Sequence, residues 1–131
     1  MKYVLLLGRI LFSSVFIIKS FDHFTAKSIA HATSKGVPMA SFLCPLAGLI
    51  ILLGGLSILL GYKARIGAWL LVIFLVPTTF MMHQFWGAGT GYVAMLESYC
   101  FLKNLSLIGA ALMIAYFGSG PLSLCCCNKK R

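Results

Sequence analysis

Four long apolar stretches run through the chain, and they limit its fold more than any other feature. The clearest covers residues 42–61 and contains no charged side chain. Roughly 20 apolar residues are enough for a helix to cross the hydrocarbon of a bilayer, so this stretch can span it. The others cover residues 3–24, 66–84 and 92–117, and all four are continuous rather than alternating, unlike the strands of a membrane barrel. We therefore expect an all-α fold, a polytopic membrane bundle of four helices.

The composition excludes a water-soluble domain. Of the 131 residues, 60% are hydrophobic and 10% are charged, whereas soluble domains have about 45–50% apolar and about 25% charged residues. The net charge of +9 does not indicate a nucleic-acid partner, because the basic residues are spread between the apolar stretches. We expect one transmembrane domain over residues 1–124, in contact with membrane lipid, and a Cys/Lys/Arg tail over residues 125–131.

The distribution of basic residues predicts the topology. With four spans, both termini lie on the same side as the short loop between the second and third spans. The basic residues of that side are Lys2, Arg9, Lys63, Arg65, Lys129, Lys130 and Arg131. Those of the other side are Lys19, Lys27, Lys35 and Lys103. Because an excess of Lys and Arg marks cytoplasmic loops, we expect both termini in the cytoplasm.

Polar residues gather at the predicted outer ends of three spans. Both acidic residues of the chain, Asp22 and Glu97, belong to this group. Lys19, Asp22 and His23 stand at i, i+3 and i+4, so they share one face of a helix. Ionisable groups in a membrane are costly unless they are paired, hydrated or needed. The pattern predicts a polar pocket that opens to the outer side, with these candidate catalytic residues: His83, Lys103, Glu97 and Asp22.

A second interpretation of these residues stays open. Lysine can extend its amine to the interface, and His, Tyr and Trp favour the headgroup zone, so the group could simply anchor the helix ends. For Lys103 and Glu97, which a long apolar stretch follows, the pocket is the favoured interpretation, with Asp22 or Glu97 as the counter-ion of Lys103. The candidate ligand-binding side chains are Trp86, Phe85, Asn104, Lys19 and His23.

The two outer-side histidines raise the question of a metal or haem. His23 and His83 on facing helices could be axial ligands of a haem. No H-E-x-x-H or similar spacing supports a metal site. We therefore expect no metal, and haem is the disfavoured cofactor.

The cysteines form two groups. Cys44 and Cys100 begin the second and fourth spans on the outer side, where they could form a disulfide or be two small buried apolar residues. Cys125, Cys126 and Cys127 follow the last span beside a basic segment, a pattern typical of acylation sites and compatible with a soft-metal site or a reduced tail.

Several segments resemble the DoxX family of small membrane proteins. Gly8-Arg9-Ile10-Leu11 opens the first span as in that family, and the segment from Leu46 to Arg65 resembles its second helix and turn. Thr79-Phe80-Met81-Met82-His83-Gln84-Phe85-Trp86 is similar to its T-F-x-x-H-x-F-W signature, and Phe101-Leu102-Lys103-Asn104-Leu105 to its F-L-K-N-L element. The chain departs from the pattern at residues 50–52, where relatives often carry a Glu.

This resemblance implies a four-helix bundle in the bacterial cytoplasmic (inner) membrane. Some relatives belong to quinone-linked sulfur oxidation or membrane redox complexes, and distant relatives act as assembly chaperones. The matching polar positions are Arg9, Lys63, Arg65, His83, Trp86, Lys103 and Asn104.

Two functions follow from the residues and the resemblance together. The first is a DoxX-like subunit of a redox-linked complex that holds a quinone, with Lys103 and His83 at its carbonyls and Trp86 and Phe85 stacked on its ring. In that case, if the protein is an enzyme, it is an oxidoreductase subunit that acts with a redox partner. The alternative is a non-catalytic scaffold or assembly chaperone that packs on another membrane protein through glycines such as Gly48 and Gly55. A homo-oligomer is compatible with either function.

Overall fold

The computed structural model describes residues 1–124, and that part of the chain is helical without strands. Its elements are α1 (Lys2–Asp22), α2 (Ala26–Ser34), α3 (Ala40–Leu60), α4 (Ala64–Met82), the 3₁₀ turn η1 (Phe85–Gly87) and α5 (Tyr92–Phe117). Four of them, α1, α3, α4 and α5, are long and apolar enough to cross a membrane. The all-α fold with four membrane-spanning helices is therefore confirmed.

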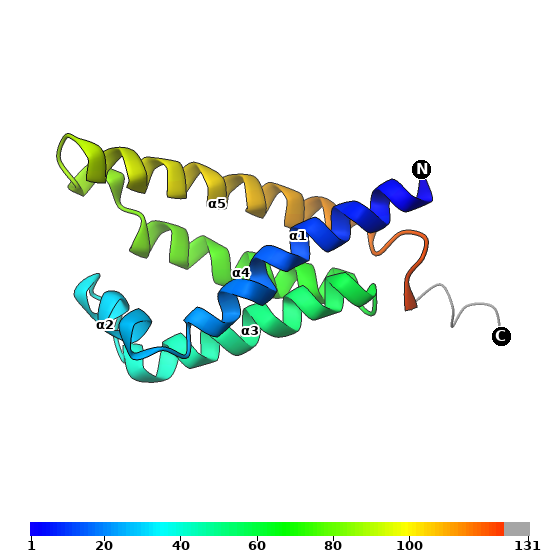
Figure 1. Cartoon of the computed structure of the whole chain (residues 1–131), viewed down its shortest axis with the longest axis horizontal. Coiled ribbons are helices and arrows are strands. Elements are labelled where there is room, and N and C mark those ends of the chain that lie inside the picture. Colours follow the sequence, from blue (N-terminus) through cyan, green and yellow to red (C-terminus); the bar gives the residue numbers. More distant parts are fainter. Residues whose placement is uncertain (125–131) are drawn as a thin grey trace.

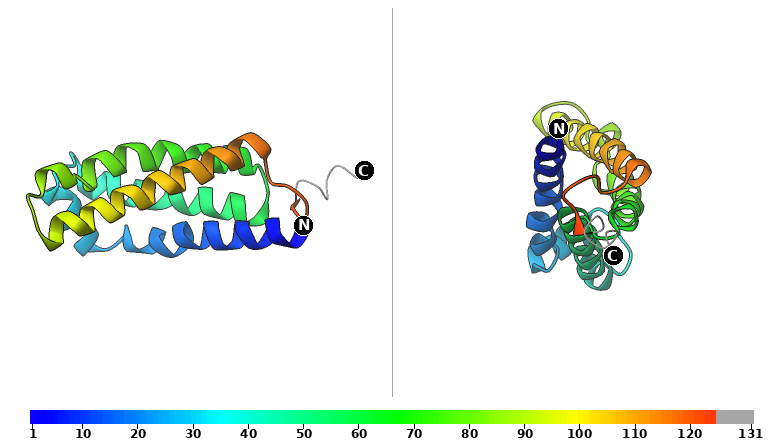
Figure 2. Two further views of the ribbon diagram at one scale, coloured as in Figure 1. Left: turned by 90° about the horizontal axis from the view of Figure 1, so that it is seen from above. Right: turned by 90° about the vertical axis from the view of Figure 1, so that its right-hand side faces the viewer.

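The long helices form a bundle in which α1 packs on α3, α3 on α4, and α4 on α5 (Figures 1 and 2). The core lies where α3 meets α4 and α1, and its fully buried side chains include Ile51, Ile58 and Leu71. Helices α1 and α5 are the two ends of this series, and Figure 1 shows them separating toward the end of the bundle that carries α2. In that half of the molecule α1 and α5 therefore diverge from each other.

Glycines allow the close approach of α3 to its neighbours. A Cβ on Gly54 would lie 2.8 Å from Leu71 Cδ2 on α4, and a Cβ on Gly67 would lie 2.9 Å from the carbonyl oxygen of Gly54. On the other side of α3, a Cβ on Gly55 would lie 3.0 Å from Ile17 of α1, and Gly48 packs equally closely on the end of α1. The glycines assigned above to a partner surface therefore serve contacts within this chain.

The end of the bundle opposite α2 is closed by a buried arginine. Arg9 on α1 is 7% exposed. Its Nη2 donates to the carbonyl oxygen of Leu59 at 2.9 Å, and its Nη1 donates to that of Ser119 at 2.8 Å. The second view in Figure 2 shows the segment after α5 crossing this end of the bundle. Arg9 thus satisfies carbonyl groups at the ends of α3 and α5, beyond the topological role that the sequence assigned to it.

The long connection between the first two membrane helices contains α2, which the sequence pattern did not predict. The hydroxyl oxygen of Thr25 accepts a hydrogen bond from the backbone N–H of Ser28 and so caps the helix. α2 packs on the first part of α3, around Ala32, Ala40 and Cys44. It lies over the end of the bundle where α1 and α5 separate.

Candidate functional site

A cavity of about 270 Å³ lies among α1, α4 and α5, in the half of the bundle that carries α2. Its apolar walls include Phe16, Ile51, Leu75 and Leu107. The polar and charged side chains that line it are Lys19, Asp22, His23, Ser28, Thr78, His83, Lys103 and Asn104. The structure therefore brings together most of the polar residues that the sequence singled out, from three separate helices.

Asn104 is the most buried polar side chain of this cavity. It is 6% exposed, and within residues 1–124 its amide has no hydrogen-bond partner. The amide atoms of Asn104 are not among the fully buried unpaired atoms, so they stay accessible from the cavity and can bond to a ligand there. Lys103 precedes Asn104 on α5 and lines the same cavity. Together they supply an amide and an ammonium group that can donate to an oxygen of the ligand.

Glu97 is the partner of Lys35 and His83, and the expected ion pair with Lys103 was wrong. Glu97 Oε1 accepts from Nζ of Lys35 at 2.7 Å, and Glu97 Oε2 lies 2.8 Å from Nδ1 of His83. The three side chains are between 16% and 27% exposed. They connect the residue after α2, the residue after α4 and the second turn of α5. Within residues 1–124 Lys103 has no ion pair, so its charge is available to a ligand.

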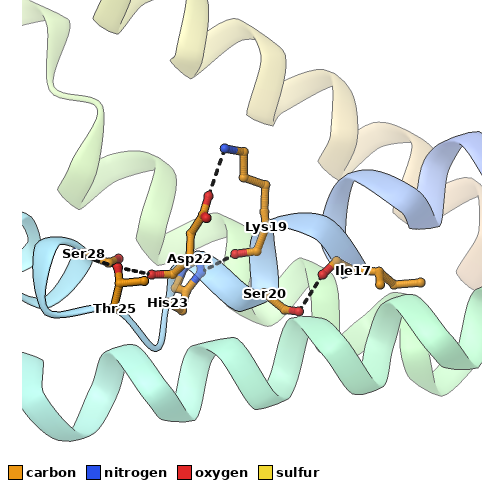
Figure 3. Close-up of polar contacts among 7 residues, drawn as sticks. All are labelled: Ile17, Lys19, Ser20, Asp22, His23, Thr25 and Ser28. Carbon is orange, nitrogen blue, oxygen red and sulfur yellow. Dashed lines mark hydrogen bonds and ion pairs between the residues drawn. The ribbon is translucent and has the colours of Figure 1, made fainter.

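The C-terminal end of α1 provides the opposite wall of the cavity (Figure 3). Nζ of Lys19 lies 3.0 Å from Oδ2 of Asp22, and the two side chains extend away from α3. Both are more than half exposed, so this pair is a weak one. Nδ1 of His23 lies 2.9 Å from the backbone oxygen of Lys19, which fixes the ring at the cavity wall. Asp22 is therefore also not the counter-ion of Lys103.

Comparison with known proteins identifies the family. The family model of DoxX matches residues 4–84, which cover α1 from Val4 onward, α2, α3, α4 and His83. This chain belongs to the DoxX family. The DoxX protein is similar to "Inner membrane protein YphA" of Escherichia coli (strain K12), with 29% identity over 123 residues, 92% of this chain and 87% of YphA. No solved structure matches the chain.

Two predicted ligand-binding residues of the DoxX protein lie outside the cavity lining. Phe85 and Trp86, both in η1, pack on Phe101 of α5, with their ring centroids 5.3 Å and 5.9 Å from that of Phe101. The ring of Phe80 also packs edge-on with Phe101, with centroids 5.6 Å apart. These rings form an aromatic cluster at the α2 end of the bundle and do not line the polar cavity. The structure gives no support to stacking of Phe85 or Trp86 on a ligand in that cavity.

The cysteines and histidines of the described chain show no metal centre. Cys44 and Cys100 are both free thiols, on α3 and α5. Residues 1–124 contain no group of three or more His, Cys, Asp or Glu side chains arranged to hold a metal ion. The acylation candidates Cys125, Cys126 and Cys127 lie outside the described residues.

A second cavity, of about 280 Å³, lies beneath α2 between α3 and α4. Its lining is mainly apolar and includes Ala47, Ile50, Pro77 and Met81. No sequence pattern predicts this cavity, because continuous apolar stretches do not show which of their faces leave a gap between helices. It adjoins the polar cavity, with which it shares part of its wall.

Proposed function

We propose that this DoxX protein is an inner-membrane subunit of a redox-linked complex and that it binds a quinone in the polar cavity. The observation that carries the proposal is the amide of the buried residue Asn104 beside the amine of Lys103, in a cavity with apolar walls. Within residues 1–124 the amide has no hydrogen-bond partner and the amine has no ion pair. Quinones present carbonyl oxygens on an apolar ring, and these are the acceptors that an amide and an ammonium group recognise. The inner-membrane location is supported by the four spanning helices and by the name of the Escherichia coli relative.

The size of the polar cavity supports a ring-sized ligand. An engineered protein cavity of about 150 Å³ binds benzene, and the cavity here has about 270 Å³. The apolar side chains Phe16 and Leu107 would contact the ring, while Lys103 and Asn104 would donate to one carbonyl oxygen. Lys103 and His83 keep the role at the carbonyls that the sequence suggested for them.

Reduction of a quinone takes up two electrons and two protons and converts both carbonyls to hydroxyls. In our proposal a partner redox protein supplies the electrons. His83 lines the cavity and contacts Glu97, so this pair can pass protons to the quinone oxygen and be recharged through Lys35 and the solvent. With both termini in the cytoplasm, as the basic residues predict, the protons would come from the outer side.

The scaffold alternative has lost one of its two sequence arguments and keeps the other, the absence of a Glu at residues 50–52. The lost argument required glycines of the second span to be available to another membrane protein, whereas Gly48 and Gly55 pack on α1 and Gly54 packs on α4. No surface of the described residues singles out such a partner in its place. A scaffold function is therefore kept as an outcome of the test rather than as a second proposal.

The test is binding of a quinone without a side chain to the full chain in lipid nanodiscs, measured by isothermal titration. Asn104→Leu keeps the volume of the side chain and removes the amide, and it should raise Kd about 3–10-fold, the value of about one hydrogen bond. Lys103→Met should raise Kd about 10-fold or more because its bond is charge-assisted. Ser106→Ala is the control, since Ser106 is exposed on the same helix and bonds only to Leu102.

Two results would contradict the proposal. One is the absence of measurable binding to the wild-type protein, which would return the scaffold function to first place. The other is binding that Asn104→Leu and Lys103→Met leave unchanged, because the quinone would then occupy a different site. Native mass spectrometry of the gently extracted protein gives an independent readout, as a bound quinone or a stable protein partner appears as a mass increase.

A further inference from the structure

The polar and apolar cavities meet along a common wall. Five residues line both of them: His23, Ser28, Phe74, Thr78 and Met82. Phe74, Thr78 and Met82 are spaced by four residues, so they form one stripe along α4. The ring of His23 packs edge-on against Phe74, with centroids 5.7 Å apart. The two cavities are therefore neighbouring compartments on either side of this stripe.

We propose that the two cavities form one binding site for an amphiphilic molecule, whose polar head occupies the polar cavity and whose hydrocarbon chain begins in the apolar cavity. The inference rests on the proposed function for the identity of the head. It adds that the ligand is recognised together with its chain, as an isoprenoid or alkyl quinone, and that the chain leaves past α4 toward α3. The common wall of His23, Phe74 and Met82 marks the crossing point between the two compartments.

The chemistry of the apolar cavity fits a hydrocarbon chain. Leu46, Ala47, Ile50, Ile73 and Met81 line it with alkyl and thioether groups. The titratable side chains in its lining are His23, on the common wall, and Cys44, a buried free thiol. Methionine side chains adapt to irregular apolar ligands. A polar occupant would find few partners there, whereas a chain would find contact on several sides.

The position of the apolar cavity also fits a chain that continues into the bilayer. Ile50 is ten residues beyond Ala40, the first residue of α3, and so lies about 15 Å along the helix from the α2 end. That distance is about half of the roughly 30 Å hydrocarbon thickness. By the same rise per residue, Asn104 is twelve residues beyond Tyr92 and lies about 18 Å along α5. A head held at Asn104 and a chain that begins at Ile50 would therefore lie side by side at a similar depth, near the middle of the membrane.

The free energy of moving the hydrocarbon chain from the bilayer into the apolar cavity determines what an experiment can detect. Lipid tails are as apolar as the cavity lining, so moving a chain from the bilayer into the cavity gains little hydrophobic free energy. The proposal therefore predicts a defined position for the chain more than a large gain in affinity. An experiment that tests the proposal must therefore locate the hydrocarbon chain of the ligand in the protein.

The experiment uses a quinone that carries a diazirine on the proximal part of an alkyl chain, bound to the full protein in nanodiscs and photolysed. Mass spectrometry of the peptides should find adducts mainly on residues 43–50 and 73–82. An excess of the unmodified alkyl quinone should reduce them at least tenfold. Ala47→Trp fills the apolar cavity and should reduce these adducts several-fold, whereas the control Leu49→Trp, at an exposed position of the same helix, should not.

The outcomes separate this inference from the proposed function. If the head-only quinone binds but the adducts lie on the outward faces of α1 and α5, the chain does not use the apolar cavity and this inference alone fails. If the adducts on residues 43–50 persist with excess competitor, bilayer chains fill the cavity non-specifically, which also overturns it. If neither the head-only nor the alkyl quinone binds, the proposed function and this inference fail together.

Discussion

Nζ of Lys35 lies 2.7 Å from Oε1 of Glu97, although the two residues are 62 positions apart in the chain. The same carboxylate contacts His83 through its other oxygen. This arrangement attaches the C-terminal end of α2 to α5 and to the end of α4, and so holds α2 over both cavities. Glu97 is the one acidic side chain of residues 1–124 that lies outside α1, and its role is to position α2 at the mouth of the site.

Removing the charge of Glu97 should release α2. In Glu97→Gln, the carboxylate that contacts both Lys35 and His83 is replaced by a neutral amide with one acceptor oxygen. We expect amide hydrogen exchange over Ala26–Ser34 to accelerate about tenfold or more, equivalent to about 1.4 kcal/mol. Asp22→Asn is the matched control, since its pair with Lys19 is largely exposed and contributes little. Equal acceleration in both variants would show that the Glu97 contacts do not hold α2.

Replacement of Arg9 should open the opposite end of the bundle. Arg9→Met keeps much of the side-chain length but leaves the carbonyl groups of Leu59 and Ser119 without their charged donor. We expect a loss of about 3 kcal/mol in the free energy of unfolding, measured by denaturant titration in mild detergent. Hydrogen exchange should also rise after residue 117. Lys63→Met, an exposed basic residue at the same end, should leave both measurements near wild type.

The contact between α3 and α4 should depend on glycine at a few positions. In Gly67→Ala the new Cβ would lie 2.9 Å from the backbone oxygen of Gly54, which cannot move without shifting the helix. We expect about 1–3 kcal/mol of destabilisation, seen as a lower thermal midpoint. Gly109→Ala meets no atom within 4 Å and should be neutral or slightly stabilising. Similar midpoints for the two variants would argue against this helix contact.

The sequence predicts the membrane bundle well because the signal is local. A continuous apolar stretch such as residues 42–61 determines that a helix spans the membrane, whatever it packs against. The gathering of polar residues is also visible, since Lys19 and His83 lie at the same ends of α1 and α4 and line one cavity with Lys103. Lys103 itself lies twelve residues into α5, not at the end of that helix as the sequence pattern predicted. These features and the DoxX motifs are confirmed as fold and family, while the topology predicted from the basic residues stays a prediction.

The sequence does not predict which polar side chains pair with each other as accurately as it predicts the membrane helices. Glu97 and Lys103 are six positions apart on one helix, which places them about 120° apart around its axis, so they do not face each other. Their actual partners depend on how α2 and α4 approach α5. Thr25 and Ser28 gave a local signal for the start of α2 that a search for long apolar helices does not use. The burial of Arg9 depends on residues 118–124, more than a hundred positions away.

The most direct test of the central claim is the reactivity of Lys103 in the presence of a quinone. Its amine has no ion pair within residues 1–124 and lines the polar cavity, so an amine-acylating reagent should modify it in the free protein. A saturating head-only quinone should slow acylation of Lys103 about tenfold and leave exposed Lys27 unchanged, as measured by quantitative mass spectrometry of the full chain in nanodiscs. Equal acylation rates of Lys103 with and without bound quinone would contradict the account.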